Sequence, residues 1–386
     1  MKVAITKETR PHEKRVAASP DTVKRMIGLG LEIVIEKDAG LAASFTDAAY
    51  EAAGAAIAPD AAAACDGAAL ILKVQRPQRD GKLDELALLK PGTALVAILS
   101  PMQNAEDVAA YAKAGITSFS MDLMPRITRA QSMDVLSSQA NLAGYKAVVE
   151  AAVEYGHAFP MMMTAAGTIA PARVTVMGAG VAGLQAIATA RRLGGIVSAF
   201  DVRAAAKEQV ESLGATFIEV DAEAAKQAET AAGYAKEMSE DYQRRQREKI
   251  HEVLKKQDIV ICTAQIPGKK APVLVTKEMI ADMKAGSVIV DLAIESGGNA
   301  EGGTVGKIVT TKNGVKLVGH ANMPSRIAAD ASALYAKNLF AFLGLIIDKE
   351  TKGLKIDLAD EIIKGTLVTR DGAIVHPALA PAAPAA

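Results

Sequence analysis

The chain contains no tryptophan, only two cysteines and no excess of charge of either sign. Its 44 Lys and Arg residues balance its 44 Asp and Glu residues, so the formal net charge is zero. A protein without a net positive field has no general attraction for nucleic acid or for an anionic membrane. Cys65 and Cys262 are too few for a disulfide framework or a spaced metal site. We therefore expect reduced thiols, no metal, no nucleic-acid partner and a cytoplasmic location.

Long apolar runs are also missing. The longest one, residues 339–347, is less than half of the roughly 20 residues that a membrane helix needs. Lys2, Lys7 and Glu8 interrupt the region where a secretory signal would need an apolar core. The sequence therefore predicts neither a membrane span nor a signal peptide. Residues 378–386 contain only Ala, Leu and Pro, and we expect a disordered tail there.

Apolar runs of strand length alternate with helical patterns in two successive series, as in parallel sheets that are covered by helices. Long helical patterns at residues 135–155 and 326–346 flank the second series. The sequence predicts an α/β protein of two doubly wound, Rossmann-like domains, separated by a cleft and joined by these two helices. The expected strands are residues 2–6, 32–36, 69–74, 94–99 and 117–120, then 174–177, 196–200, 216–220, 259–263, 287–291 and 316–319.

The end of the chain carries a hairpin signal. Asp371-Gly372 stands between the strand patterns 366–370 and 373–376, and Asp-Gly favours the positive φ angles of a tight turn. We expect this hairpin to rejoin the first domain. That domain is then discontinuous, residues 1–136 plus 326–386, and residues 137–325 form the nucleotide-binding domain. Clefts between domains commonly hold ligands.

A glycine-rich turn follows the strand pattern at residues 174–177. Gly178, Gly180 and Gly183 have the G-x-G-x-x-G spacing and lead directly into a helical pattern. In such a turn the first glycine allows the tight bend, the second lets a pyrophosphate approach the backbone, and the third lets helix and strand pack closely. Glycines in small-residue helices can serve packing alone, but the strand and helix around these favour dinucleotide binding.

Asp201 follows the next strand, where an acidic residue accepts a hydrogen bond from a ribose 2′-hydroxyl. A carboxylate at this position repels the 2′-phosphate of NADP, which favours NAD(H). Arg203 could instead pair with that phosphate, so NADP remains the alternative.

A polar segment, residues 124–134, precedes the first long helix. It carries Arg126, Arg129, Gln131, Ser132 and Asp134 within nine residues. On composition alone the segment is best interpreted as a solvated loop in which Ser132 or Asp134 caps the helix.

The same segment carries a resemblance to a known family. Residues 125–134 (PRITRAQSMD) and 137–145 (SSQANLAGY) resemble the NAD(H)-binding component of proton-translocating nicotinamide nucleotide transhydrogenases. The similarity covers nearly the whole chain. It continues through residues 159–167 (FPMMMTAAG), 178–185 (GAGVAGLQ), 207–214 (KEQVESLG), 233–238 (GYAKEM) and 370–377 (RDGAIVHP).

The resemblance implies a site and a set of partners. It implies that Arg126, Gln131 and Asp134 hold the dihydronicotinamide and face an NADP(H)-binding component, and that Ser137 contacts the carboxamide. It implies hydride transfer from NADH to NADP⁺ on that partner, coupled to proton translocation by membrane-spanning subunits, and a homodimer on the cytoplasmic face of the inner membrane. The further cofactor contacts that it implies are Ile127, Thr128, Ser132, Met133, Val181, Val202, Arg203, Gln246, and Gly233 and Tyr234 in a mobile lid.

One residue and one segment in the second half of the chain do not fit a simple cofactor site. Gln265 stands where the family usually has Leu, so an apolar adenosine contact is in doubt there. Residues 221–252 are charged and long for a connection between strands, which by itself indicates a solvated helical face. Only the resemblance makes part of this region a lid.

An ordinary dehydrogenase must also move a proton, usually with a histidine, whereas hydride passage between two nicotinamides creates no alkoxide. The five histidines, His12, His157, His251, His320 and His376, are dispersed and form no evident pair.

Two rival functions remain. An alanine dehydrogenase-like oxidoreductase is similar at Arg15 and Lys73, but its histidine is missing from residues 96–101 (VAILSP). Arg15 and Lys73 are then interpreted as structural charges lining the cleft. The other rival is a non-catalytic NAD(H) sensor, which needs no loop aimed at a second nucleotide.

Overall fold

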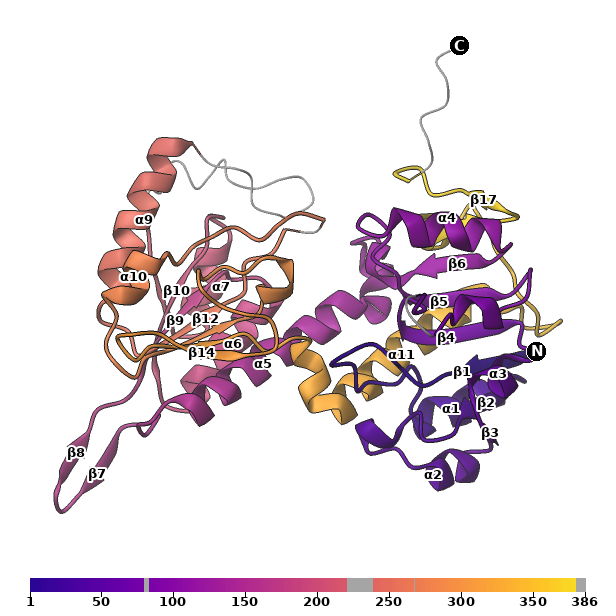
Figure 1. Ribbon diagram of the computed structural model, residues 1–386, viewed down its shortest axis with the longest axis horizontal. Helices are drawn as coiled ribbons and strands as arrows, with labels where there is room; N and C mark the ends of the chain where they lie inside the picture. The colour runs from indigo at the N-terminus through magenta and orange to yellow at the C-terminus, as the bar shows by residue number, and fades with distance from the viewer. Residues whose placement is uncertain (80–82, 221–238, 267, 380–386) are drawn as a thin grey trace, which may run out of the picture. The chain divides into compact units, whose positions relative to one another are not determined.

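The computed structural model describes residues 1–79, 83–220, 239–266 and 268–379, which divide between two compact units (Figure 1). Unit 1 comprises Met1–Gln139 and Ser325–Ala386, and unit 2 comprises Ala140–Pro324. The domain boundaries predicted from the sequence are 136/137 and 325/326. The predicted tail lies almost wholly outside the described residues.

Unit 1 is built on one sheet in the order β17-β16-β6-β5-β4-β1-β2-β3. The chain starts in the middle with β1, adds β2 and β3 on one side, and then crosses to β4, β5 and β6 on the other, all parallel. The switch point of a doubly wound sheet, here between β1 and β4, is where such sheets bind ligands. The parallel strands are β1 (Lys2–Ile5), β2 (Glu32–Glu36), β3 (Ala56–Ala58), β4 (Leu70–Gln75), β5 (Ala94–Ile98) and β6 (Thr117–Ser120).

The C-terminal hairpin returns to this sheet, as predicted. β16 (Leu367–Arg370) pairs antiparallel with β6, and β17 (Ala373–Ile374) pairs with β16. Asp371 and Gly372 both have positive φ, 52° and 79°, which matches the twist of a two-residue hairpin turn.

Helices cover both faces of this sheet with separate apolar cores. Ser19 caps α1 (Pro20–Gly28), and Pro20 at the first helical position already has the φ that a helix needs. The long α11 (Ala328–Ile346) buries its apolar side against the sheet, with the ring of Phe342 5.5 Å from that of Phe119. The other helices of the unit are α2 (Asp47–Ala52), α3 (Ala61–Cys65), α4 (Ala105–Lys113) and α12 (Glu361–Thr366).

Unit 2 repeats the doubly wound plan in the order β11-β10-β9-β12-β13-β15-β14. Its switch point lies between β9 and β12, which are parallel neighbours. All the pairings of the main sheet are parallel except that of β14 with β15. The strands are β9 (Arg173–Met177), β10 (Ile196–Phe200), β11 (Thr216–Phe217), β12 (Ile259–Cys262), β13 (Val288–Asp291), β14 (Ile308–Thr310) and β15 (Lys316–Val318).

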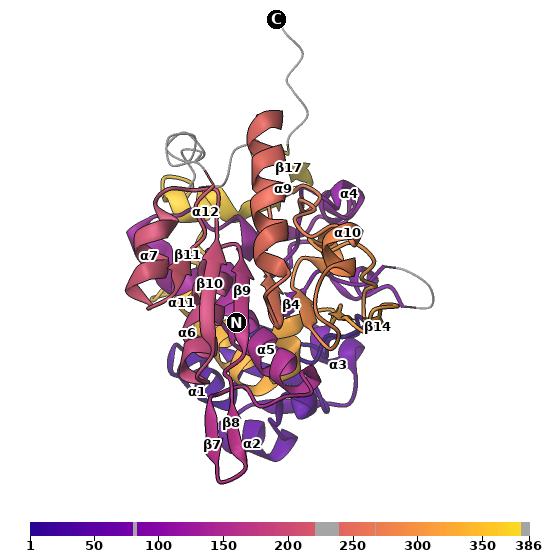
Figure 2. The ribbon, with the colours of Figure 1, turned by 90° about the vertical axis from the view of Figure 1, so that its left-hand side faces the viewer.

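The helices of unit 2 pack closely where glycine allows it. α5 (Val135–Glu154) begins in unit 1 and continues into unit 2, where a Cβ on its Gly144 would lie 2.0 Å from the carbonyl oxygen of Ala182 in α6 (Val181–Arg192). A small two-stranded hairpin, β7 (Met162–Thr164) and β8 (Gly167–Ile169), projects away from the main sheet (Figure 2). The remaining α-helices among the described residues of this unit are α7 (Ala206–Ser212), α9 (Glu240–Leu254) and α10 (Lys277–Ala281).

Candidate functional site

The turn between β9 and α6 requires a glycine at its first position. Gly178 has φ +102°, a conformation that L residues rarely adopt, and its amide donates to the carbonyl of Phe200 at 2.8 Å. A Cβ on Gly178 would also lie 2.7 Å from the hydroxyl of Thr263. The turn is therefore held between the ends of β10 and β12.

The other two glycines of the turn differ in the space around them. A Cβ on Gly183 would lie 1.9 Å from the carbonyl oxygen of Gly178, so any side chain would force the helix off the strand. A Cβ on Gly180 would meet nothing within 4 Å. Gly180 also provides no side-chain cap for the first amides of α6. This open space at the N-terminus of a helix suits the pyrophosphate of a dinucleotide.

Asp201 lies at the end of β10, beside the turn. Its Oδ2 accepts a hydrogen bond from the amide of Ala179 at 2.8 Å, which fixes the carboxylate against the glycines. Arg203 donates to both carboxylate oxygens, from Nε at 2.9 Å and from Nη2 at 2.8 Å. The guanidinium would have to give up this ion pair to bind a 2′-phosphate.

The loop after β12 borders the turn on its other side. Thr263 donates its hydroxyl to the carbonyl of Gly178 at 2.9 Å. Gln265 is exposed, and its Nε2 donates to the carbonyl of Leu292 at 2.8 Å. The side chain of Gln265 is thus hydrogen-bonded to the residue that follows β13.

The remaining predicted contacts on unit 2 differ in accessibility. Val181 is exposed as the first residue of α6, whereas Val202 packs against the core. Gln246 is buried on the inner face of α9, with Tyr242 and Ile250. The predicted lid residues Gly233 and Tyr234 lie outside the described residues.

The predicted nicotinamide loop of unit 1 is a short 3-10 helix, η4 (Thr128–Met133), rather than an irregular loop. Met133 is buried in the core and Ile127 packs against it, so these two anchor the segment. The polar members face solvent, namely Arg126, Thr128, Arg129, Gln131 and Ser132. Arg129 forms a two-pronged ion pair with Asp360, at 2.7 and 2.8 Å, which ties the segment to α12.

Asp134 acts as the cap of α5. Its Oδ1 accepts the amide of Ser137 at 2.9 Å and its Oδ2 accepts the hydroxyl of Ser137 at 2.5 Å. The capping role that composition favoured is therefore present at Asp134. It orients both predicted contact residues at the start of the helix.

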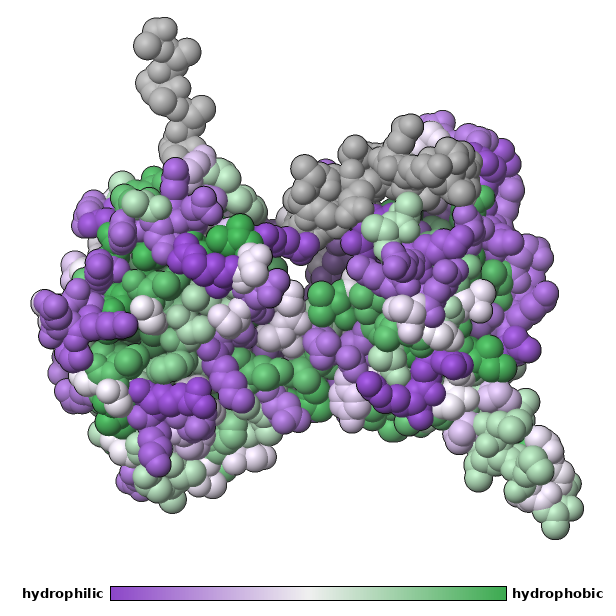
Figure 3. Space-filling model, turned by 180° about the vertical axis from the view of Figure 1, so that it is seen from behind, coloured by the Kyte–Doolittle hydropathy of each residue, from purple (hydrophilic) through white to green (hydrophobic). Residues whose placement is uncertain are grey.

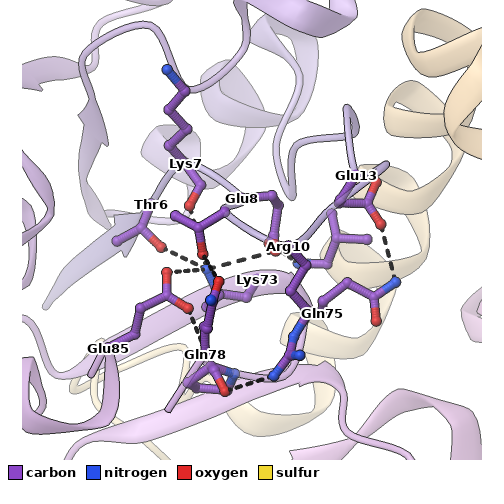
Figure 4. A network of polar contacts seen from close by, with 12 residues as sticks. Thr6, Lys7, Glu8, Arg10, Glu13, Lys73, Gln75, Gln78 and Glu85 are labelled. Carbon is purple, nitrogen blue, oxygen red and sulfur yellow. Dashed lines mark hydrogen bonds and ion pairs between the residues drawn. The ribbon is translucent and has the colours of Figure 1, made fainter. Parts of the chain in front are cut away.

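The switch point of the unit 1 sheet is filled by charged side chains of the chain itself (Figure 4). Lys73, inside β4, donates to Glu85 at 3.0 Å and to Thr6 at 3.2 Å, and lies 3.6 Å from Glu8. Arg15 pairs with Glu13 through Nη2 at 2.7 Å. All five charged groups are at most 9 % exposed, so three carboxylates are buried with two cations.

Burial and pairing act differently on these acids. Burial raises the pKa of Glu8 to about 7, because desolvation outweighs the attraction of Lys73. Burial alone would also raise the pKa of Glu13, but Arg15 and its hydrogen bonds outweigh it and lower the pKa to about 2. Both cations that resemble those of alanine dehydrogenases are thus already neutralised. The segment after β5, where an alanine dehydrogenase-like histidine was sought, carries Leu99 and Ser100, whose amides donate to Oδ1 of Asp122 at 3.0 and 3.4 Å.

Two family models match consecutive parts of the chain. The alanine dehydrogenase/PNT N-terminal domain matches residues 4–143, and the alanine dehydrogenase/PNT C-terminal domain matches residues 147–377. The chain belongs to the alanine dehydrogenase/PNT family. This confirms the resemblance found in the sequence.

Relatives within this family include transhydrogenase subunits and alanine dehydrogenases. The chain is 60% identical over 380 residues to the first part of NAD(P) transhydrogenase subunit alpha of Rhodospirillum rubrum, covering 98% of this chain and 99% of that protein. The solved structure of the transhydrogenase from Sinorhizobium meliloti is 52% identical, with a TM-score of 0.87, and the match covers 97% of this chain and all of that one. An alanine dehydrogenase of Halomonas elongata is 30% identical over 398 residues, covering 99% of this chain and 96% of that protein. The predicted α/β class with two doubly wound, Rossmann-like domains is confirmed.

Among the residues that the structure describes, no helix has the length and apolarity to cross a bilayer. Over the same residues, no group of three or more His, Cys, Asp or Glu side chains is arranged to hold a metal ion.

Sequence reasoning missed Thr263, Asn299 and the carboxylates around Lys73 as parts of these sites. Thr263 carries a recognisable signal, since it follows the strand beside the glycine turn. Asn299 and Glu8 carry none, because their partners are remote in sequence: Asn299 contacts residue 264, and Glu8 contacts residues 73 and 74.

Proposed function

We propose that this chain is the NAD(H)-binding subunit of a proton-translocating transhydrogenase. It binds NADH, and a hydride passes directly to NADP⁺ held by a partner component. The observation that carries this proposal is the glycine turn, in which Gly178 and Gly183 admit no side chain while Gly180 faces open space. The similarity to transhydrogenase subunits over nearly the full chain supports the reaction class.

Each residue then has a limited task. The amides at the start of α6 bind the pyrophosphate beside Gly180, and Asp201 accepts a ribose hydroxyl. Arg126, Gln131 and Asp134 hold and orient the dihydronicotinamide. The nicotinamide supplies the hydride itself. Because no alkoxide forms, the residues need only to position the ring and exclude water.

The charge network of unit 1 argues against turnover of an amino acid or 2-oxo acid. A substrate carboxylate needs a cation, but Glu13 pairs with Arg15, and Glu8 and Glu85 surround Lys73. We therefore rank the alanine dehydrogenase-like activity second.

We further propose a homodimer that associates with membrane-spanning partners on the cytoplasmic face of the inner membrane. The β7–β8 hairpin supports self-association. All its strand residues are exposed, Met161 is 60% and Met163 78% exposed, and the hairpin forms a pale green and white projection (Figure 3). An isolated two-stranded hairpin is at best marginally stable in water, so a second copy that covers it would stabilise it.

The hydride-transfer proposal can be tested with Gln131→Ala. Mixed with a separately purified NADP(H)-binding component, the wild-type chain should reduce an NAD analogue at the expense of NADPH. The variant should be roughly 100-fold slower in stopped-flow measurements, since a small misplacement of a reacting ring has effects of that order. Gln209→Ala, at an exposed position of α7, serves as the control and should leave the rate unchanged.

The outcomes separate the alternatives. Oxidation of alanine by the chain alone would favour the dehydrogenase. NADH binding without any hydride transfer, and without an effect of Gln131→Ala in the assembled complex, would favour the sensor.

Nucleotide preference gives a second test. The wild-type chain should bind NADH more tightly than NADPH, and Asp201→Asn should weaken NADH binding by roughly tenfold, because a charge-assisted hydrogen bond to the ribose is lost. Fluorescence titration with both nucleotides measures this. Asp258→Asn is a matched control, because Asp258 also accepts a strand amide, that of Arg173, and pairs with Lys284. Tighter binding of NADPH by the wild-type chain would contradict the prediction.

A further inference from the structure

Asn299 is completely buried in unit 2, and its side chain makes a two-point contact with the backbone of Ala264. Its Oδ1 accepts the amide of Ala264 at 3.0 Å, and its Nδ2 donates to the carbonyl of the same residue at 2.9 Å. The Nδ2 also donates to the carbonyl of Pro272 at 2.8 Å. One side chain therefore holds two points of the segment that follows β12.

Asn299 is itself held in place by a buried acid. The carboxylate of Asp291, at the end of β13, accepts the amides of Asn299 at 2.7 Å, Ala300 at 2.9 Å and Ala293 at 2.9 Å. Three amides fix this carboxylate and the segment after β13 together. The amide group of Asn299 is thus presented from a rigid support.

The contact at Ala264 leads directly to the glycine turn. The preceding residue, Thr263, donates its hydroxyl to the carbonyl of Gly178, the same carbonyl against which Gly183 packs. The turn is therefore braced on the β10 side by Asp201 and on the β12 side by Thr263. The backbone of Thr263 is held on one side by its own amide, which donates to the carbonyl of Met177 at 2.8 Å, and on the other side by Ala264, which Asn299 holds.

We propose that Asn299 is a positioning residue for dinucleotide binding: it holds Ala264, and through Thr263 it fixes the glycine turn around the pyrophosphate. The proposal rests on the NAD(H)-binding function proposed above. Asn299 touches no ligand in this scheme. It acts only through the backbone of the neighbouring loop.

The matched control is a second asparagine of the same unit that ties another loop. Asn313 donates from Nδ2 to the carbonyls of Ile280 at 2.9 Å and Ala281 at 3.1 Å, and contacts neither the turn nor the segment after β12. Asn299→Ala should reduce NADH affinity by roughly tenfold or more, since the side-chain hydrogen bonds that hold Ala264 and Pro272 beside the turn are lost. Asn313→Ala should lower the melting temperature without changing NADH affinity.

The conservative variant adds a readout that general destabilisation would not produce. In Asn299→Asp a carboxylate oxygen replaces the donor and faces the carbonyls of Ala264 and Pro272, so NADH should bind weakly at pH 8. Protonation restores one donor, and the affinity relative to wild type should recover as the pH falls towards 5. Asn299→Ala should show no such recovery.

Thr263→Val keeps the proposal testable if Asn299→Ala does not fold. It removes the hydroxyl that bonds to Gly178 and should also weaken NADH binding; combined with Asn299→Asp, the losses should be less than additive. Wild-type affinity in Asn299→Ala, or equal losses of affinity in Asn299→Ala and Asn313→Ala, would overturn the proposal. If the wild-type chain does not bind NADH, the proposed function fails instead.

Hydrogen exchange tests the structural role of Asn299 separately. Faster amide exchange at Gly178 in Asn299→Ala would support the proposal that Asn299 holds the glycine turn through Ala264 and Thr263, and unchanged exchange would refute it.

Discussion

Replacing Gly183 by alanine is expected to abolish NADH binding and to destabilise unit 2 by about 3 kcal/mol, the upper end of typical overpacking costs. The added Cβ would lie 1.9 Å from the carbonyl oxygen of Gly178, a backbone atom that cannot rotate away. Helix α6 must therefore move off β9, and this movement takes the amides at its N-terminus out of line. Thermal unfolding together with NADH titration measures both effects.

Gly180→Ala should separate binding from folding at the same turn. A Cβ on Gly180 meets nothing within 4 Å, and its φ of −77° is open to alanine, so the melting temperature should be unchanged. The methyl group would occupy the space of the pyrophosphate and weaken NADH binding by roughly tenfold or more, the effect of losing one charge-assisted hydrogen bond.

Gly156 supplies the control, because a Cβ there also meets nothing within 4 Å and Gly156 lies outside the turn. Gly156→Ala should leave NADH binding unchanged. NADH affinity at the wild-type level in Gly183→Ala, or unchanged affinity in Gly180→Ala, would contradict the assignment of this turn.

The fold was predictable where burial dictates a continuous apolar run. β5 (ALVAI) and β12 (IVIC) agree with the predicted strands to within one residue, because parallel strands covered on both faces are apolar along their length. The missed strands lack this signal. β3 is an Ala-rich edge strand, β14 is an edge strand with no buried residue, and the β7–β8 hairpin is wholly exposed. The strand predicted at residues 216–220 is shorter, since β11 ends at Phe217.

Some residues of the candidate site were likewise predictable from the local sequence, and others were not. The roles of Gly178, Gly180 and Gly183 are local, since each is set by a strand, a turn and a helix that adjoin in sequence. The sequence indicates that Gln265 departs from the family pattern, but only the structure shows that its side chain bonds to the carbonyl of Leu292. The contacts of Asn299 and Glu8 are created by the order of strands in a sheet. Sequence patterns that describe one element at a time do not contain that order.

The buried carboxylate of Glu8 should make unit 1 less stable as the pH rises from 5 to 8. Its pKa is raised by burial from 4.5 to about 7, so between these values the folded chain holds a proton that the unfolded chain has released. The stabilising contribution is complete below pH 4.5 and is lost as the pH rises through 7. At about 1.4 kcal/mol per pKa unit, Glu8 accounts for a loss of about 3 kcal/mol.

Two other acids of unit 1, Glu36 and Glu13, also have shifted pKa values that affect how stability depends on pH. The pKa of Glu36 is also raised by burial, so it adds to the loss as the pH rises above 4.5. The pKa of Glu13 is lowered to about 2, so its stabilising contribution is present above pH 4.5 and is lost only as the pH falls through 2. Glu13 therefore contributes nothing to a difference between pH 5 and pH 8.

Glu8→Gln should remove most of this pH dependence. The amide oxygen can still accept the amide of Val74, which bonds to Oε1 of Glu8 at 2.6 Å, and Lys73 keeps its bond to Glu85 at 3.0 Å. The other carboxylate oxygen, Oε2, accepts no hydrogen bond but lies 3.6 Å from Nζ of Lys73, so the variant loses this ion pair at pH 8, where the wild-type carboxylate is ionised. Urea unfolding at pH 5 and pH 8 measures the change in stability. Glu32→Gln, at the exposed first residue of β2, serves as the control. An equal loss of stability in wild type and in Glu8→Gln would show that this carboxylate does not exchange its proton near neutral pH, and that Lys73 holds it ionised despite its burial.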